Sequence, residues 1–84
     1  MRYHLHIRNG DVLIEDLEGE EFPDLDTARR EAVRCVRELL AERLRRGDVL
    51  DGEAMEIWDE TGRLVDSVSF RSQLRLPGSG TDGV

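Results

Sequence analysis

One long amphipathic segment constrains the fold of this chain more than any other feature. Either Asp24 or Asp26 can cap the start of a helix there, and Gly47, which follows a basic last turn, can end it. At about 100° per residue, the apolar side chains gather on one half of the helical wheel. They are Leu25, Ala28, Ala32, Val33, Cys35, Val36, Leu39, Leu40 and Leu44. A helix of this kind gains its stability from packing, so the rest of the chain must supply a sheet that covers it.

The residues before this segment predict a β-hairpin. Polar and apolar residues alternate over residues 2–8, and Asn9-Gly10 is typical of a two-residue hairpin turn. With that turn, Ile7 pairs with Val12 and the second strand extends to about Leu17. The side of the hairpin that faces the helix then carries Tyr3, Leu5, Ile7, Val12, Ile14 and, against the apolar pattern, Asp16.

The residues after the helix predict a second hairpin, with strands over 54–59 and 63–70 and a turn at Glu60-Thr61-Gly62. In the last strand, Leu64, Val68 and Phe70 share one side, which Asp66 interrupts. The expected fold is therefore α+β, in the order ββαββ: a four-stranded antiparallel sheet with one long helix packed on one face. We expect a single domain over residues 1–72 and a disordered tail over residues 73–84, where glycine and proline leave little to pack.

Composition narrows the function classes. The chain has 84 residues and a net charge of −7, and an acidic protein is repelled by nucleic acid and by anionic lipid unless its charges are segregated. Cys35 is the one cysteine, which suits a reducing compartment, so we expect a cytoplasmic protein. We expect neither an export leader nor a membrane-spanning segment, because the chain has no sufficiently long apolar stretch.

Several short motifs at fixed spacings resemble one bacterial family of domains of unknown function, the one numbered six-eight-nine-four. The residues that carry the resemblance are Arg2-Tyr3, His6, Arg8, Gly10, Asp16, Glu18-Gly19, Pro23-Asp24-Leu25, Ala28-Arg29-Arg30-Glu31-Ala32 and Asp59-Glu60-x-Gly62-Arg63. The resemblance extends over residues 2 to about 71, and His4 stands where the family pattern has an aromatic residue. It implies a small soluble bacterial protein without an established activity, and it supplies no catalytic residues.

The side of the sheet without a helix is the main candidate for function. The residues predicted to point there are His4, His6, Leu13, Trp58 and Val65. A tryptophan and two aliphatic residues on one open face are typical of a surface that binds a protein partner or a second copy of the chain. A loop or the tail lying over these side chains explains the same pattern.

Arginines on the solvent side of the helix are the alternative site. Arg30, Arg34 and Arg37 could follow the phosphates of a nucleic acid, and the protein would then be a nucleic-acid-associated accessory factor. Glutamates interleave with these arginines, however, and such a mixture is more typical of a solvated helix face. We therefore expect a protein partner rather than a nucleic acid.

The sequence contains only weak indications of a metal or cofactor site. His4 and His6 lie two residues apart on one strand face and could share a metal, but pairing of His4 with Glu15 on a wet surface explains them more simply. The acidic run 16–26 lacks the spacing of a calcium loop and fits a solvated connection that also caps the helix. We expect no cofactor and no metal.

Two further residues stand out on the helix. Arg29 falls within the apolar half of the wheel, so we predict a structural ion pair between Arg29 and Asp16, the carboxylate on the inner side of the first hairpin. Cys35 falls on the same packed half, where an inert thiol is usual. The serines and this cysteine have no recognisable acid–base partner, so we expect no enzyme activity.

Overall fold

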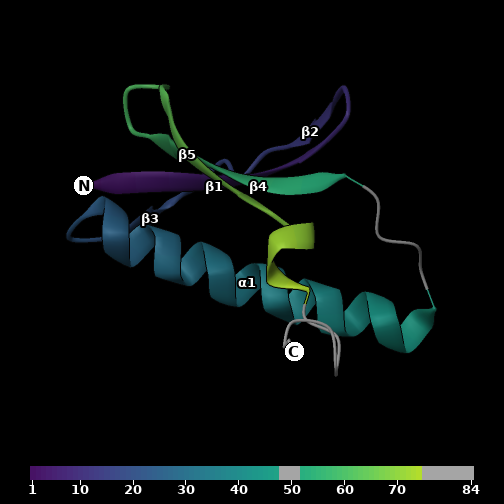
Figure 1. Cartoon of the computed structure of the whole chain (residues 1–84). Coiled ribbons are helices and arrows are strands. Elements are labelled where there is room, and N and C mark those ends of the chain that lie inside the picture. Colours follow the sequence, from purple (N-terminus) through teal and green to yellow (C-terminus); the bar gives the residue numbers. More distant parts are fainter. Residues whose placement is uncertain (48–51, 75–84) are drawn as a thin grey trace.

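The computed structural model describes residues 1–47 and 52–74 of the chain. In this part, a sheet lies on one side of a single long helix (Figure 1). The elements in chain order are β1 (Arg2–Asn9), β2 (Val12–Ile14), β3 (Glu20–Glu21), α1 (Leu25–Arg46), β4 (Glu53–Asp59), β5 (Leu64–Ser69) and the short 3-10 helix η1 (Arg71–Gln73). None of the described helices is long and apolar enough to cross a membrane.

The sheet is antiparallel in the order β2-β1-β4-β5, and β3 pairs with the first residues of β1. This confirms the predicted α+β fold, but the second strand is shorter than predicted. The predicted strand over residues 11–17 ends at Ile14, and the pairing with β1 resumes only at Glu20. The chain between them forms a loop against the edge of β1, and this loop helps to build the site described below.

The helix ends confirm the predicted caps. Asp24 has an extended backbone, and its carboxylate accepts a hydrogen bond from the backbone N–H of Thr27 at 2.8 Å. The hydrogen bond from the Thr27 hydroxyl, and after it the one from the Thr27 backbone, lower the pKa of Asp24, which favours the ionised carboxylate beside the positive end of the helix dipole. Gly47 ends the helix in the left-handed conformation with φ of 76°, which glycine adopts without steric cost.

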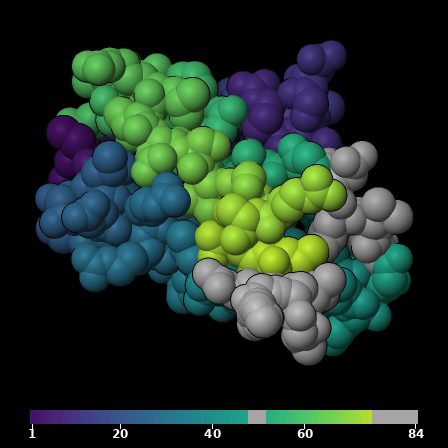
Figure 2. All heavy atoms as spheres, in the orientation of Figure 1, coloured from purple at the N-terminus to yellow at the C-terminus, as the bar shows by residue number. Residues whose placement is uncertain are grey.

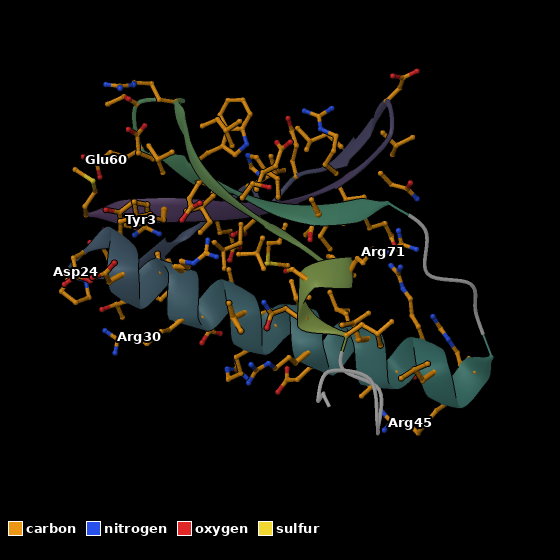
Figure 3. The ribbon with its side chains drawn as sticks, viewed as in Figure 1. Tyr3, Asp24, Arg30, Arg45, Glu60 and Arg71 are labelled. Atoms are coloured by element: carbon orange, nitrogen blue, oxygen red, sulfur yellow. The ribbon has the colours of Figure 1, made fainter. Side chains whose placement is uncertain are left out.

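The core lies between α1 and the middle of the sheet. The helix presents two fully buried alanines, Ala28 and Ala32, and then Val36 and Leu40, one turn apart along a single stripe. The small residues let the helix approach the sheet closely at its N-terminal end. The opposing buried side chains are Tyr3, Phe22, Met55, Ile57, Val68 and Phe70, and Figure 3 shows Tyr3 between β1 and the helix.

The register of the first hairpin differs from the prediction by two residues. Ile7 pairs with Ile14, and Asn9 pairs with Val12, so the turn residues are Gly10 and Asp11. Gly10 has φ of 61°, and positive φ at only the first turn residue is the pattern of a type II′ turn. A two-residue shift preserves the side on which every side chain lies, because the period of a strand is two.

The helix covers less of the sheet than expected. Val12 and Ile14 lie on the predicted inner side but are 60% and 58% exposed, because β2 stands away from the helix (Figure 1). Beyond β5, η1 packs beside both the last strand and the helix (Figure 2). Gln73, the first residue of the predicted tail, is the last residue of η1, and Leu74 follows it; the tail from residue 75 lies outside the described residues.

An extra residue in β5 overturns two placements. Ile57 pairs with Asp66 while Trp58 pairs with Leu64, so a β-bulge holds Val65 between them. Val65, predicted on the open face, packs instead against the core, and Leu64, predicted inside, is 52% exposed. Because of this extra residue, the side chains before Asp66 lie on the opposite side of the sheet from the one that simple alternation predicts.

Candidate functional site

The sheet side opposite the helix is called the outer face here. Cross-strand pairing places His4 opposite Trp58, His6 opposite Glu56 and Arg8 opposite Ala54, while the residues between them on β1 point toward the core. Leu13 of β2 lies opposite Arg8 and is half-buried on the same side. Four of the five side chains predicted to bind a partner, His4, His6, Leu13 and Trp58, therefore share this face.

Asp16 organises the edge of the outer face where β2 has ended. Its backbone N–H donates to Nδ1 of His6 at 2.9 Å, and Nδ1–H of His4 donates to its backbone carbonyl at 2.7 Å. Because a carbonyl oxygen only accepts and an amide only donates, the two imidazoles must use opposite roles at Nδ1. His6 therefore carries its proton on Nε2, and both rings are held in place by one peptide segment.

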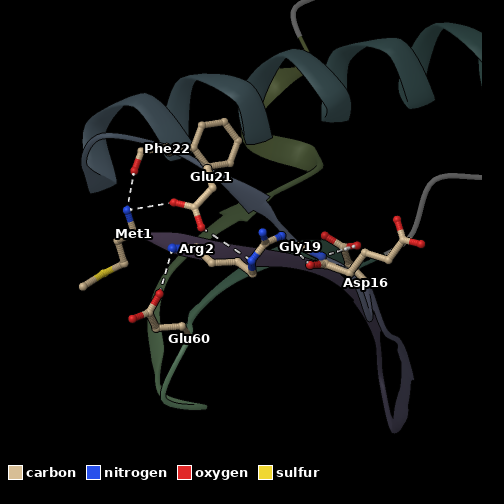
Figure 4. A network of polar contacts seen from close by, with 8 residues as sticks. Met1, Arg2, Asp16, Gly19, Glu21, Phe22 and Glu60 are labelled. Atoms are coloured by element: carbon tan, nitrogen blue, oxygen red, sulfur yellow. Dashed lines mark hydrogen bonds and ion pairs between the residues drawn. The ribbon is translucent and has the colours of Figure 1, made fainter.

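The Asp16 side chain completes this attachment. Its carboxylate accepts the backbone N–H of Leu5 and the backbone N–H of Gly19, each at 3.2 Å. Figure 4 shows Asp16 and Gly19 side by side along β1. Gly19 has φ of 70°, and a Cβ there would lie 2.8 Å from the backbone oxygen of Tyr3, so only glycine allows the loop to approach β1 this closely.

Hydrogen bonds join side chains of β1 and β4 on the outer face. The indole Nε1–H of Trp58 donates to Glu56 at 2.9 Å, and Nε of Arg8 donates to the other oxygen of the same carboxylate at 3.0 Å. The Glu56 side chain is only 13% exposed, and the hydrogen bond from Arg8 lowers its pKa. The ring of His6 lies 5.6 Å from that of Trp58 and 5.9 Å from that of His4. Trp58 is half-buried, its indole N–H bonds to Glu56, and the ring of His6 lies beside it.

A shallow pocket of about 240 Å³ opens beside these rings, between the loop after β2 and the turn after β4. It is called the outer pocket below. Its lining residues are His4, His6, Glu15, Asp16, Leu17, Trp58, Asp59, Glu60 and Gly62. Four of the nine are carboxylates and none is an arginine or lysine, so the outer pocket is acidic with an aromatic wall.

Two of these carboxylates also hold the walls together. Asp59 accepts hydrogen bonds from Thr61 and from the backbone N–H of Arg63, and the contact with the Thr61 side chain is the main cause of its lowered pKa. Glu60 accepts the backbone N–H of Arg2 at 3.0 Å, which ties the turn after β4 to β1 (Figure 4). The guanidinium of Arg2 itself contacts Glu21 and the carbonyl of Glu18.

The predicted ion pair between Arg29 and Asp16 is wrong. Nη1 of Arg29 lies 2.9 Å from Oδ2 of Asp66, and the same nitrogen donates to the carbonyl of Ser67. The helix contacts β4 and β5, and Arg29 lies beside Asp66 of β5, whereas Asp16 lies at the edge of β1 beside the histidines. Arg29 thus joins the helix to the second hairpin, not to the first.

The predicted nucleic-acid residues line a groove of about 460 Å³ along the helix, together with Asp26, Arg29 and Val33. Arg34 pairs with both Glu31 and Glu38, and these contacts raise its pKa. Nε of Arg37 donates to Gln73 of η1 at 3.2 Å. Arg30 points away from the sheet (Figure 3). Carboxylates of the same helix therefore neutralise the middle of the arginine stripe.

The other chemical candidates have plain structural environments. Cys35 donates to Glu31 at 3.5 Å, and burial, with that carboxylate nearby, raises the pKa of its thiol to about 11. A thiol with a raised pKa is a poor nucleophile at neutral pH. Within residues 1–47 and 52–74, no three histidine, cysteine, aspartate or glutamate side chains are placed to hold a metal ion.

The pocket walls include residues that sequence reasoning missed. Glu15 was expected opposite His4, but the strand ends before it, and Asp16 takes that place through its backbone. The sequence predicts Asp59 at the end of a strand and Glu60 at the start of a turn, but it does not predict that either lines a site. The acidic residues at both ends of the pocket are visible in the sequence, but only the strand order brings them together.

Comparison with known proteins agrees with the motifs. A family model described as a domain of unknown function, DUF6894, matches residues 2–71, which confirms the resemblance found in the sequence. Searches of curated proteins and of solved structures found no significant match to this chain.

Proposed function

The chain belongs to the DUF6894 family, and we propose that it is a small protein-interaction module that binds its partner through the outer face. In this proposal it has no catalytic role and needs no cofactor. The lone thiol of Cys35 suits a cytoplasmic protein, because a reducing compartment keeps it free.

The observation that carries the proposal is the fixed position of Trp58 beside an open concavity. Tryptophan is enriched among the residues that dominate binding energy, above all where its ring lines a pocket. Here the indole is half-buried, anchored by Glu56 and flanked by the ring of His6. A side chain that is already ordered loses little entropy when a partner covers it, which favours affinity.

The alternative function is nucleic-acid association through Arg30, Arg34 and Arg37. The groove along the helix favours it, since arginine predominates in its lining. The internal pairing of Arg34 with two glutamates disfavours it, because those carboxylates would repel a phosphate backbone.

Two variants separate these functions. Trp58→Ala alters the outer face, and the triple change Arg30→Gln, Arg34→Gln and Arg37→Gln removes the helix charges. The purified proteins are compared for self-association by analytical ultracentrifugation, for partner capture from native cells, and for retention on nucleic acid at rising salt. Circular dichroism establishes that each variant is folded.

Loss of self-association or capture only in Trp58→Ala is the expected result. Loss of either only in the helix variant, or salt-sensitive nucleic-acid binding that the helix variant abolishes, would overturn the proposal. Equal binding by wild type and Trp58→Ala would also overturn it.

A further inference from the structure

We infer that the outer pocket holds the side chain of an arginine from the partner, so that the partner presents a basic segment to the outer face. This inference rests on the proposed function and names the chemistry of the group that binds. Three properties of the pocket carry it: its aromatic wall, its charge and its size.

The aromatic wall suits a flat cation. Trp58 and the two histidine rings form a continuous row, with centroids 5.6 Å and 5.9 Å apart. A guanidinium stacks on such faces and is attracted by the negative face of an indole. His6 accepts the Asp16 N–H through Nδ1, so its ring is already held beside the indole of Trp58 before a partner binds.

The charge of the pocket is opposite to that of the guest. Glu15 and Glu60 are exposed at opposite walls, the first on the loop after β2 and the second on the turn after β4. Glu15 has no hydrogen bond or ion pair with any residue that the structure describes, and Glu60 uses a single oxygen, Oε1, for the backbone of Arg2. Both can therefore accept new N–H donors, and a guanidinium presents five in a fixed plane.

The nearest positive charges already have partners or lie outside the pocket. The guanidinium of Arg2 contacts Glu21 and the carbonyl of Glu18. The positive charge of Arg63, in the turn after β4, is one of the smaller causes of the lowered pKa of Asp59, but Arg63 does not line the pocket. The cavity thus keeps an excess of negative charge, in keeping with the net charge of −7 of the whole chain.

The volume fits one side chain. Sites for drug-sized ligands measure about 300–1,000 Å³, and the outer pocket measures about 240 Å³. A single long side chain that enters from a partner can fill such a space, while the surrounding outer face contacts the partner's backbone.

Trp58 supplies the assay, because it is the one tryptophan in the chain. A blocked Gly-Arg-Gly tripeptide is titrated into the 15N-labelled protein, and both the indole fluorescence and the indole N–H resonance are followed. The matched probes are the same peptide with citrulline, which keeps the shape without the charge, and with lysine, which keeps the charge without the planar fork. We expect saturable binding of the arginine peptide, with a Kd about tenfold lower than that of the citrulline peptide.

Charge variants locate the binding. Glu15→Gln and Glu60→Gln are each expected to weaken the arginine peptide about two- to fivefold, the range for one exposed ion pair. Asp11→Asn is the matched control, since it removes one carboxylate at the exposed tip of the first hairpin, and its Kd is expected to stay at the wild-type value.

Three results would overturn the inference. They are a citrulline or lysine peptide that binds as tightly as arginine, an Asp11→Asn effect equal to that of Glu15→Gln, and no saturable change at Trp58. If the arginine peptide fails while Trp58→Ala still abolishes partner binding, the inference falls and the proposed function stands. If both fail, the outer face is not a binding surface.

Discussion

Removing the Asp16 carboxylate tests whether the loop after β2 is held in the way the structure shows. In Asp16→Ala, the backbone N–H groups of Leu5 and Gly19 lose their acceptor, while the backbone contacts of Asp16 with the two histidines do not depend on its side chain. A hydrogen bond to a charged acceptor contributes about 1.5–3 kcal/mol when buried. These two are only partly buried and water replaces some of the loss, so we expect a total cost of about 2 kcal/mol.

For a domain of this size, each kcal/mol lowers the melting temperature by about 4–8 °C, so Asp16→Ala is expected to melt about 10 °C lower than wild type. Urea unfolding followed by far-UV circular dichroism gives the free energy directly, and Asp16→Asn should fall between, since its amide keeps one acceptor oxygen. Glu15→Ala is the matched control, exposed and adjacent, and should change stability by less than about 0.5 kcal/mol. If the two alanine variants were equally stable, the account of the loop would be refuted.

Three further predictions concern the frame around the site. Gly19→Ala should cost at least about 2 kcal/mol and clearly more than Gly10→Ala, because both have positive φ but only the first Cβ would meet a backbone oxygen; thermal melts of the two variants compare them. Arg43→Met should lower the free energy of unfolding by about 3 kcal/mol in urea unfolding, because it leaves the Glu53 carboxylate, 8% exposed, without its ion-pair partner. Adding Glu53→Gln to this variant should restore part of the lost stability. Because the pKa of Glu56 is lowered from its ordinary value of 4.5, the ionised carboxylate stabilises the fold fully above pH 4.5. The difference in unfolding free energy between wild type and Glu56→Gln should therefore shrink as the pH falls below that value. A difference that stays constant down to about pH 3 would contradict this account.

The parts of the fold that the sequence predicts correctly depend on neighbours along the chain. Asp24 and Gly47 cap the helix through contacts within one turn. The predicted side of each β1 residue is correct although the predicted register is not. The turn lies one residue later than predicted, which shifts the pairing by two residues, and an even shift leaves every side chain on the same side of the sheet. Local chemistry alone could not choose between Asn9 and Gly10 as the first turn residue, since both tolerate positive φ.

The parts that it missed depend on contacts between distant residues. The second strand ends at Ile14, and two residues later Asp16 forms hydrogen bonds with both histidine side chains and with Leu5, which lie ten to twelve residues away in the chain. The bulge at Val65 lets Trp58 stay on the outer face while Val65 packs against the core. Alternation of polar and apolar residues carries no signal for an inserted residue, so Val65 was placed on the wrong side.

The ion pair of Arg29 shows that the strand order, which the sequence does not predict, determines which aspartate lines the outer pocket. The sequence contains two aspartates among inward-facing residues, Asp16 in the first hairpin and Asp66 in the second, and Arg29 can reach only one of them. With β1 and β4 in the centre of the sheet, the helix contacts β4 and β5, and Arg29 near its start pairs with Asp66. Asp16 is then left at the opposite edge, where its hydrogen bonds fix both histidines and close one wall of the outer pocket. The carboxylate expected to join helix and hairpin instead shapes the surface proposed to meet a partner.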